Sequence, residues 1–545
     1  MISTILLLAA VLTGGGVDAA RPTAAAPHDA AMGPATEAPT RTVRMWVYLA
    51  DKGLATPAEH ALALDEARDR LSPRTLARRS QRGTRDALVD ETDIAVAERY
   101  RAAIVATGAT VRHTSRWLNA VSVQASAAQV QAIAHLPFVE RLEPVRRSVP
   151  LDAEGTGVGG GPPSGQCPWG MTTGQLAQAG ITGLHDAGVT GEGIVIGVLD
   201  TGFATTHEVF NQPGHEIDVI AAWDFVNDDP IVGYEPGDEF EGPFGTVYPH
   251  SHGTRVLSTI AGSLDCVFVG GAPDAAFVLA KTEDVSQEVP AEEDAYVAGL
   301  EFIEANGADL ATSSLGYIDW YEWSDLNGQT AATTVAVNMA TANGLVCVTA
   351  VGNGSHDSDL PTLIAPSDAF QVIAAGAVDP DGVIAGFSSN GPTADGRLKP
   401  EVLAQGVGVW CASALEDDTY SQSNGTSFST PLTACAVALI LQMHPEWSVS
   451  NVRDALFSTA SLSVAEGGPD PDSLQGFGII DALAASGFQP GVVGDLDGDG
   501  AVGGADLGML LAAWGNCPGC AADIDTDGLV GGADLGLLLA AWTGG

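Results

Sequence analysis

The stretch Gly193-Ile-Val-Ile-Gly-Val-Leu-Asp-Thr-Gly202 decides the fold class of this chain. Its apolar part, Ile194–Leu199, is almost uninterrupted, which is typical of a strand buried on both faces of a parallel sheet. An acidic residue, Asp200, follows directly at the expected carboxyl end of that strand. The stretch therefore predicts an α/β domain that presents a polar side chain at the sheet edge where ligands bind.

Helix-like and strand-like segments alternate downstream of this strand, and the two predicted helices end at Gly307 and Gly344. Such alternation indicates βαβ units, so we predict an α/β fold with a doubly wound, mostly parallel sheet and helices on both faces. Right-handed crossovers would bring Asp200, Ser314 and Asn353 to one edge of the sheet, at the carboxyl ends of their strands. The predicted helices cover 291–306 and 331–343, and the predicted strands cover 310–313 and 345–351.

Length and composition limit the class of protein. With 545 residues the chain exceeds one ordinary domain, and its 45% of apolar residues exclude global disorder. The net charge of −45 argues against a nucleic acid or an anionic membrane as partner, because such partners require basic patches. The first 150 residues carry 18 Lys and Arg against 15 acidic residues, whereas the rest carries five against 53. A mildly basic leader is therefore joined to a strongly acidic remainder.

The N-terminus has the pattern of an export signal. Residues 1–20 contain an apolar run too short to span a bilayer, followed by small residues, as in a cleavable signal peptide. No later stretch approaches 20 consecutive apolar residues, so we expect no membrane span and a protein that is secreted or attached to the cell surface. The other predicted parts are a linker at 21–42, an α+β module at 43–149, a Gly-rich linker at 150–174, the α/β domain at 175–488 and a repeat module at 492–545.

Four separate segments carry the residue types that nucleophilic catalysis by serine requires. Such catalysis needs a hydroxyl, a base to take its proton, an acid to orient that base, and donors for the developing oxyanion. The last segment also opens an apolar helix that should run to about Met443 as buried core. The segments are Val198-Leu-Asp-Thr-Gly202, His250-Ser-His-Gly-Thr254, Ala350-Val-Gly-Asn-Gly354 and Asn424-Gly-Thr-Ser-Phe-Ser-Thr-Pro431.

In their order Asp, His, Ser, these segments resemble the subtilisin-like serine peptidases, or subtilases. The resemblance covers roughly residues 175–488. It implies that Ser427 is the nucleophile, that His252 is the general base and then the general acid, and that Asp200 orients His252. Asn353 would donate its side-chain amide to the oxyanion. Further segments that carry the resemblance are Gly271-Ala-Pro273, Thr312-Ser-Ser-Leu-Gly316 and Ser388-Ser-Asn-Gly-Pro-Thr393.

The same resemblance implies a protein or peptide substrate and a strand that binds it. Ser314, Leu315 and Gly316 would form an edge strand that pairs with an extended peptide, so that backbone hydrogen bonds supply affinity. His250 competes with His252 for the role of base, but only His252 is followed by the Gly-Thr of the motif. The chemistry itself needs no cofactor.

The module at 43–149 resembles subtilase propeptides in its layout and position. Clustered arginines, among them Arg78, Arg79 and Arg82, face a domain rich in acid, and such complementarity favours docking. The chain's own propeptide is therefore an expected partner, cleaved off between about residues 150 and 171. The alternative is an ordinary N-terminal domain that stays attached. The expected elements are strands at 43–49, 119–124 and 139–143 and helices at 98–107 and 127–135.

Residues 494–515 and 522–543 repeat each other at a period of 28. Each copy places oxygen-bearing residues at positions 1, 3, 5, 7 and 12 of a loop with Gly at position 6, which is the pattern of a calcium loop. An apolar helix follows each loop, so we predict a two-loop calcium-binding helical module with Ca²⁺ in a structural role. The predicted ligands are Asp495, Asp497, Asp499, the Ala501 carbonyl and Asp506 in the first loop, and Asp523, Asp525, Asp527, the Leu529 carbonyl and Asp534 in the second.

Asp at position 12 in a tandem pair resembles the type I dockerin module, and this resemblance implies a cohesin-type scaffold as partner. The loop positions that influence partner choice in that family are Gly504-Ala505 and Gly532-Ala533, which lack the hydroxyls common in cellulosomal dockerins. A calcium-stabilised cap without a partner is the alternative. Cys517 and Cys520 flank Pro-Gly and could form a tight disulfide in an oxidising compartment.

The sequence therefore predicts a secreted, calcium-binding serine endopeptidase that is made as a precursor. The competing prediction is a catalytically silent binding or adhesion protein of the same fold, held on a surface by its C-terminal module. The intact set of four catalytic segments favours the enzyme.

Overall fold

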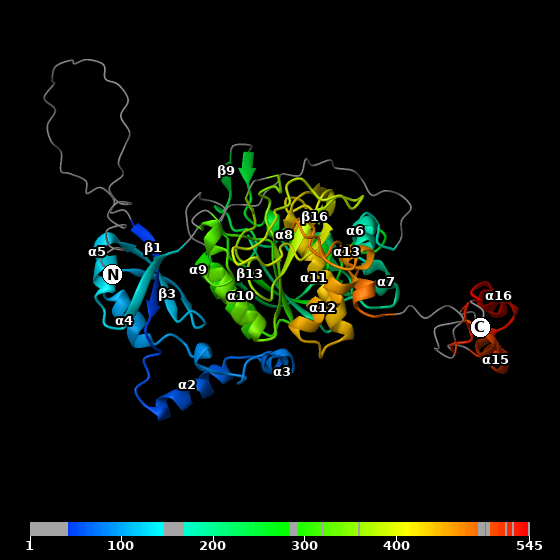
Figure 1. Cartoon of the computed structure of the whole chain (residues 1–545), viewed down its shortest axis with the longest axis horizontal. Helices are drawn as coiled ribbons and strands as arrows, with labels where there is room; N and C mark the ends of the chain where they lie inside the picture. Colours follow the sequence, from blue (N-terminus) through cyan, green and yellow to red (C-terminus); the bar gives the residue numbers. More distant parts are fainter. Residues whose placement is uncertain are drawn as a thin grey trace, which may run out of the picture. The chain divides into compact units, whose positions relative to one another are not determined.

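The computed structural model describes residues 42–145, 168–242, 245–283, 293–318, 321–357, 360–488, 496, 502–517, 520–525 and 528–542. They form an N-terminal α+β module, a large α/β domain and a small C-terminal helical module (Figure 1). The predicted signal peptide at 1–20 and all but the last residue of the predicted linker at 21–42 lie outside the described residues.

The N-terminal module is a four-stranded antiparallel sheet with the strand order β2-β3-β1-β4. The three predicted strands and two predicted helices are confirmed, whereas the sequence pattern predicts neither β2 nor the two helices between β1 and α4. We call residues 57–93, which contain these two helices and a short 3-10 turn, the arm. The elements are β1 (Thr42–Leu49), α2 (Pro57–Asp69), α3 (Pro73–Arg82), η1 (Glu91–Asp93), α4 (Glu98–Val105), β2 (Thr110–Ser115), β3 (Ala120–Ser126), α5 (Ala127–Ala134) and β4 (Val139–Pro144).

The α/β domain is built on seven parallel strands in the order β17-β16-β15-β14-β5-β13-β8. The strand predicted after Gly193 is β5, and it lies between β14 and β13. The chain leaves β5 toward one side and later returns to its other side, which creates the switch point where open α/β sheets bind ligands. The strands are β5 (Val195–Asp200), β8 (Asp218–Asp224), β13 (Ala276–Lys281), β14 (Leu310–Ser313), β15 (Val346–Ala350), β16 (Ile373–Val378) and β17 (Val402–Gln405).

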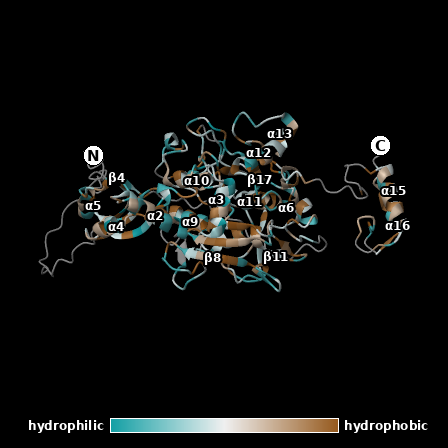
Figure 2. Cartoon of the chain, turned by 90° about the horizontal axis from the view of Figure 1, so that it is seen from below, coloured by the Kyte–Doolittle hydropathy of each residue, from teal (hydrophilic) through white to brown (hydrophobic). Residues whose placement is uncertain are grey.

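Alternate residues of β5 reach two separate hydrophobic cores. Ile196 and Val198 belong to a core with residues of α8 and α11, while Val195 and Leu199 belong to a core with residues of α9 and α10. Helices therefore cover both faces of the sheet, as predicted, and the hydrophobic segments gather between them (Figure 2). The helices are α8 (Ser251–Ala261), α9 (Glu293–Ala305), α10 (Ala332–Ala342) and α11 (Thr426–Met443).

Helix α11 is the central helix of the first core. It is long and apolar enough to cross a membrane by composition, yet 89% of its 18-residue apolar window is buried inside the domain. Within the part of the chain that the structure describes, no other helix passes the same test. The helix is therefore the buried core helix that the sequence predicts, and its packing fixes the position of its N-terminus.

The described chain resumes at Pro168 and packs on the α/β domain before position 175. Met171 donates its backbone N–H to the Val267 carbonyl at 3.0 Å, and the Thr172 hydroxyl donates to the Val269 carbonyl at 2.7 Å. These residues pack like the domain rather than like the linker expected there. The remaining elements of the domain are α6 (Thr173–Gln178), α7 (Ile181–Asp186), η2 (Glu208–Phe210), β6 (Asn211–Gln212), β7 (His215–Glu216), β9 (Phe240–Gly242), β10 (Gly245–Val247), β11 (Ser263–Leu264), β12 (Phe268–Val269), η3 (Trp323–Asp325), β18 (Val409–Ala412), β19 (Tyr420–Ser423), α12 (Val449–Thr459), α13 (Ser461–Glu466) and α14 (Ala482–Ala485).

Helix α9 presents buried acidic side chains to arginines of the N-terminal module. Asp294 pairs with Arg112 at 2.9 Å, and Glu301 pairs with Arg116 at 3.2 Å. Both carboxylates are buried, and the Ser115 hydroxyl also donates to Glu301, at 2.6 Å. The predicted charge complementarity is therefore present as specific ion pairs.

Glu304 forms the most deeply buried part of this contact. Its two oxygens accept from Arg79 at 2.8 and 2.9 Å, and Arg78 pairs with it as well. Burial by itself would raise the pKa of Glu304, but the guanidinium groups of Arg78, Arg79 and Arg116 outweigh burial and hold this pKa below its usual range. Removing one partner of a buried ion pair costs about 3–5 kcal/mol. The module and the domain therefore stabilise each other through this carboxylate.

We expect acid to weaken this contact. A carboxylate with a lowered pKa in the folded state stabilises that state above its unfolded pKa of roughly 4, and this stabilisation is lost as the pH falls through the lowered value. Asp294 is such a group, because His113 and Arg112 outweigh the effect of its burial and lower its pKa. The free energy of unfolding, measured with urea, should therefore fall less between pH 5 and pH 3 in Asp294→Asn than in the wild type. Asp69→Asn, an exposed acid at the end of α2, is the control. Equal losses in Asp294→Asn and the wild type would contradict this account.

Candidate active site

Asp200 and His252 meet where the end of β5 approaches the start of α8. His252 Nδ1 lies 2.7 Å from Asp200 Oδ1, the oxygen that also accepts the Thr201 backbone N–H at 2.7 Å. Because a carboxylate only accepts, this contact assigns a proton to Nδ1 and leaves Nε2 as the basic nitrogen of the neutral ring. The Asp200 side chain is fully buried, whereas that of His252 is 14% exposed. The imidazole is therefore fixed in the orientation and tautomer that a general base needs.

Two glycines permit this close approach. A Cβ at Gly253 would lie 2.2 Å from the Gly202 carbonyl oxygen and 2.9 Å from Asp200 Cβ. Gly202 itself has a φ of +129°, a backbone conformation that residues with side chains rarely adopt. The glycines of the Asp-Thr-Gly and His-Gly-Thr motifs are therefore steric requirements for the contact between Asp200 and His252.

His250, the competing base, lies in different surroundings. Its Nε2 is 3.3 Å from the Ala414 carbonyl oxygen, and its ring packs near Tyr234 and Tyr248. Burial lowers the pKa of His250. His250 contacts a backbone carbonyl, whereas His252 contacts the carboxylate of Asp200, so the geometry favours His252 as the base.

Ser427 lies in the first turn of α11 and is 1% exposed. Its hydroxyl lies 3.4 Å from the Ser314 carbonyl oxygen, and the Ser314 hydroxyl donates to the Ser427 carbonyl at 2.7 Å. The ring of Phe428, the next residue, has its centroid 6.1 Å from that of the His252 ring. The N-terminal ends of α8 and α11 therefore lie together, and they carry His252 and Ser427.

Asn353 follows β15 and is oriented by Thr426. Asn353 Oδ1 accepts both the backbone N–H and the hydroxyl of Thr426, each at 2.9 Å. A Cβ at Gly425 would lie 3.4 Å from Asn353 Nδ2 and 3.7 Å from the Ser427 backbone nitrogen. Two nitrogen donors therefore border the space that Gly425 leaves open. This space lies at the N-terminus of α11, where the helix dipole makes the potential positive. Such a space suits a small anionic oxygen.

Sequence reasoning does not single out Thr426 or Gly425 as functional residues. Thr426 fixes the amide of Asn353, and Gly425 has a φ of +140° that brings the chain into α11 without filling the space. The signal for both is their position directly before Ser427 in the motif Asn-Gly-Thr-Ser.

The predicted substrate segment, Ser314–Gly316, lies directly beyond the end of β14 and is not itself part of a strand. β14 is not an edge strand, because it pairs with β5 on one side and with β15 on the other. Ser314, Leu315 and Gly316 continue beyond its end as buried residues. A Cβ at Gly316 would lie 2.0 Å from Ile364 Cδ1, so this segment is covered on that side. The central position of β14 in the sheet leaves only the backbone beyond Ser313 outside strand pairing.

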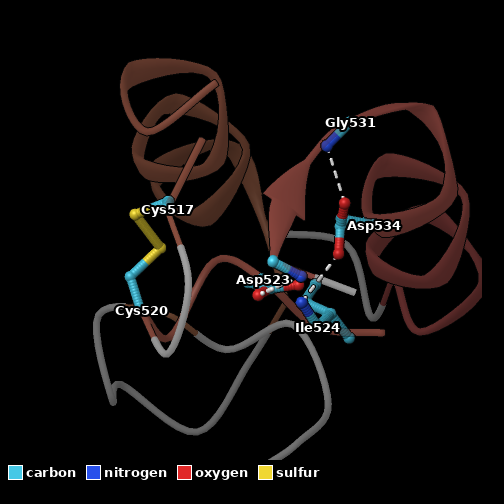
Figure 3. Close-up of a disulfide and its surroundings, with 7 residues drawn as sticks. Cys517, Cys520, Asp523, Ile524, Gly531 and Asp534 are labelled. Atoms are coloured by element: carbon cyan, nitrogen blue, oxygen red, sulfur yellow. Dashed lines mark hydrogen bonds between the residues drawn. A yellow bond between two sulfur atoms is a disulfide. The ribbon is translucent and has the colours of Figure 1, made fainter. Parts of the chain in front are cut away.

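The second predicted calcium loop brings three of its ligands together. Figure 3 shows two of them, Asp523 and Asp534. Carboxylate oxygens of Asp523, Asp525 and Asp534 all lie within 4.8 Å of one another. The backbone N–H groups of Ile524 and Gly531 hold Asp534, at 2.7 and 2.6 Å. Asp523 Oδ1 is buried and has no hydrogen-bond partner among the described residues. A buried carboxylate oxygen of this kind, beside two further carboxylates, fits a hard cation such as Ca²⁺.

The first loop matches the second where the structure describes it. Asp506 accepts the backbone N–H groups of Leu496 and Gly503, both at 2.7 Å, as Asp534 does in the second loop. The predicted ligands Asp495, Asp497, Asp499, Ala501 and Asp527 lie outside the described residues, and Leu529 lies on β21. The predicted disulfide between Cys517 and Cys520 is present (Figure 3). The module's elements are α15 (Gly504–Ala512), β20 (Gly515–Asn516), β21 (Leu529–Val530) and α16 (Gly532–Ala540).

A second group of carboxylates lies in the α/β domain, at Asp224, Asp229 and Glu235. Asp224 is already paired with Lys281 at 2.8 Å and accepts the Val226 backbone N–H at 2.7 Å. An ammonium group therefore supplies the positive charge that Asp224 requires.

Comparison with known proteins assigns this fold to a family. The Subtilase family matches residues 191–478, which is more than half of the chain, and the chain belongs to that family. The Peptidase S8 propeptide domain, Bacteroidota, matches residues 44–156, so the N-terminal module is a propeptide domain of this kind.

Curated relatives agree with this assignment. Subtilisin E of Bacillus subtilis (strain 168) is 32% identical over 287 residues, which cover 52% of this chain and 65% of that protein. The subtilisin of Bacillus pumilus is also 32% identical over 287 residues, which cover 90% of that protein. An alkaline protease of Shouchella clausii is 29% identical over 375 residues, covering 69% of this chain and 81% of that protease. The matched region spans less than two thirds of subtilisin E and most of the length of the other two proteins. The similarity to these relatives supports the assignment of the chain as a serine peptidase.

Gly425→Ala should lower kcat because the added methyl group enters the space beside Asn353 Nδ2. Loss of an oxyanion donor in subtilisin costs roughly 10²–10³ in kcat, and we expect a loss of about that size here. Gly396→Ala is the matched control, because Gly396 also has a positive φ, +85°, but a Cβ there meets nothing within 4 Å. Hydrolysis of a peptide substrate measures kcat, and circular dichroism checks folding. Equal kcat values for the two folded variants would show that the space has no catalytic role.

Proposed function

We propose that this chain is the precursor of a secreted serine endopeptidase in which Asp200, His252 and Ser427 form the catalytic triad and Asn353 donates to the oxyanion. The observation that carries this proposal is the 2.7 Å contact between Asp200 Oδ1 and His252 Nδ1, at the start of a helix that adjoins the helix of Ser427. The disulfide between Cys517 and Cys520 supports export, because such bonds persist in oxidising compartments.

In the proposed mechanism, Ser427 Oγ attacks the carbonyl carbon of a peptide bond while His252 Nε2 takes its proton. The buried carboxylate of Asp200 stabilises the imidazolium that forms. The carbonyl oxygen becomes an anion and enters the space between Asn353 Nδ2 and the Ser427 backbone N–H. His252 then gives its proton to the leaving amine, and a water molecule repeats the sequence to release the acyl group.

Peptide substrates would bind through the backbone that follows β14. Ser314, Leu315 and Gly316 lie beyond the last paired residue of this strand, and Ser314 contacts the backbone of Ser427. An extended peptide that adds its hydrogen bonds to this segment would bring its carbonyl to the Ser427 hydroxyl.

Ser427→Ala should abolish turnover. The loss known for removal of the nucleophile in subtilisin is about a millionfold in kcat. Casein hydrolysis by the wild type and by the variant measures this difference, and a serine-directed phosphonate followed by peptide mass analysis should modify Ser427. Absence of both hydrolysis and labelling in the processed wild type would favour the catalytically silent, surface-held protein instead.

We further propose that the C-terminal module binds Ca²⁺ in each loop and acts as a dockerin-type attachment module. Asp523, Asp525 and Asp534 would hold the ion of the second loop, with the Leu529 carbonyl and Asp527 completing the set. The ion would neutralise the loop carboxylates and connect each loop to the helix that follows it.

Exposed apolar side chains on the two repeats support an attachment role. They occur as pairs separated by the repeat period of 28, and all are at least 40% exposed. Exposed apolar side chains mark interaction sites where they form a contiguous patch. A cohesin-type partner would bind at this surface. The pairs are Met509 and Leu537, Leu511 and Leu539, and Trp514 and Trp542.

Asp523→Asn together with Asp534→Asn should remove one tightly bound Ca²⁺ from the chain, because two ligands of one loop lose their charge. Equilibrium dialysis of the full chain with Ser427→Ala counts the bound ions without self-digestion. Glu466→Gln, an exposed acid at the end of α13, is the control and should leave the count unchanged. An unchanged count in the double variant would refute a calcium site in this loop.

A further inference from the structure

The arm contacts the peptidase domain at the amino ends of the parallel strands, whereas the proposed catalytic residues lie at their carboxyl ends. Strands β14 and β15 begin at this edge, directly after the C-terminal ends of α9 and α10. Asp200 and Asn353 lie at or beyond the other ends of their strands. Figure 1 shows α3 at the ends of these helices, as the contacts below specify. The arm therefore binds the domain without occupying the catalytic edge.

Helix α3 inserts buried arginines into this opposite edge. Arg78 is fully buried, pairs with Glu304 and donates to the Ala308 carbonyl. Arg82 pairs with Asp309 at 3.3 Å and donates to the Pro445 carbonyl at 2.8 Å. The edge thus offers two carboxylates and several carbonyl oxygens to guanidinium groups, which are the best side chains for such acceptors.

The arm also caps the C-terminal ends of α9 and α10. The Ser72 backbone N–H donates to the Ala305 carbonyl at 3.0 Å, and the Thr84 backbone N–H donates to the Ala342 carbonyl at 2.9 Å. Carbonyls in the last turn of a helix have no partner within that helix, so these contacts satisfy groups that otherwise need water. The positive arginines also lie at the negative ends of both helix dipoles.

Two glycines of the domain fit the arm at close range. A Cβ at Gly307 would lie 2.8 Å from Ser72 Oγ, and a Cβ at Gly344 would lie 2.8 Å from Arg82 Cβ. These are the glycines that end the two helices. The two glycines therefore allow the arm to approach this surface closely, and the carboxylates of the surface bind the arginines of the arm.

We propose that the arm is a retention clamp, which keeps the cleaved propeptide on the peptidase domain independently of any contact at the catalytic edge and sets the rate at which the mature peptidase is released. This inference rests on the precursor role proposed above but not on catalysis by Ser427. Release must separate buried carboxylates, Glu304 and Asp309, from their guanidinium partners, and salt screens such buried pairs only weakly. Dissociation of the arm is therefore slow and depends little on ionic strength.

The test uses the full chain with Ser427→Ala and a cleavage site for an exogenous, site-specific protease inserted within residues 150–165. After cleavage and dilution, gel filtration over time measures how much propeptide remains with the domain. Arg78→Gln with Arg82→Gln should raise the dissociation constant about 100-fold or more. Arg99→Gln with Arg101→Gln is the matched control, because Arg101 pairs with Glu98 of the same helix and Arg99 lies over the Tyr100 ring.

A propeptide that stays bound in the wild type and the control but dissociates in the arm variant supports the clamp. Equal retention in the arm variant and the control would overturn it, as would immediate release from the wild type.

If the double variant fails to fold, Arg74→Gln replaces it in the test. The Arg74 side chain is 41% exposed, yet it donates to the Gly193 carbonyl at 2.6 Å and pairs with Asp309. This variant should dissociate about tenfold faster than the wild type, and an unchanged rate would also overturn the clamp. Since cleavage is external, failure of Ser427 to act as nucleophile leaves these outcomes unaffected.

Discussion

The contact between the end of β5 and the start of α8 is the constraint on which the candidate site depends. Gly202 and Gly253 remove the side chains that would hold these two ends apart, and only then does His252 Nδ1 reach Asp200 Oδ1. The hydrogen bond is sheltered because Asp200 is fully buried, and a sheltered carboxylate orients an imidazole more strongly than a solvated one. Helix α11 completes the arrangement because its own packing in the same core fixes its first turn beside α8.

The carboxyl and amino ends of the parallel strands carry different sets of polar groups. We call these two ends of the sheet its carboxyl edge and its amino edge. At the carboxyl edge the strand ends and helix N-termini provide a carboxylate, an imidazole and nitrogen donors, which suit a reaction that develops negative charge. At the amino edge the helix C-termini and buried acids provide negative potential, which the arginines of the arm neutralise. The charge asymmetry between the first 150 residues and the rest of the chain therefore has a local meaning, because the basic and acidic side chains meet as specific buried pairs.

The sequence predicts the sheet, its helices and the residues at the carboxyl edge, because apolar runs, helix-ending glycines and compact motifs are local signals. β5, β14 and α11 occur where the pattern places them. The two helices of the arm are not predicted, since α3 is strongly polar and has few apolar residues, although its arginines are expected to face the acidic domain. The sequence nevertheless contains N-terminal capping signals for both helices of the arm, namely Thr56 before Pro57 and Ser72 before Pro73. The central position of β14 in the sheet is not visible in the sequence, because strand order is a long-range property that local patterns do not carry.

A crystal structure of the processed protein after reaction with a peptidyl phosphonate tests the central claim most directly. The account predicts a covalent bond from Ser427 Oγ to phosphorus, one phosphoryl oxygen within hydrogen-bond distance of both Asn353 Nδ2 and the Ser427 backbone nitrogen, and an intact hydrogen bond between His252 and Asp200. A phosphonate attached at another residue, or a phosphoryl oxygen directed away from Asn353, would contradict it.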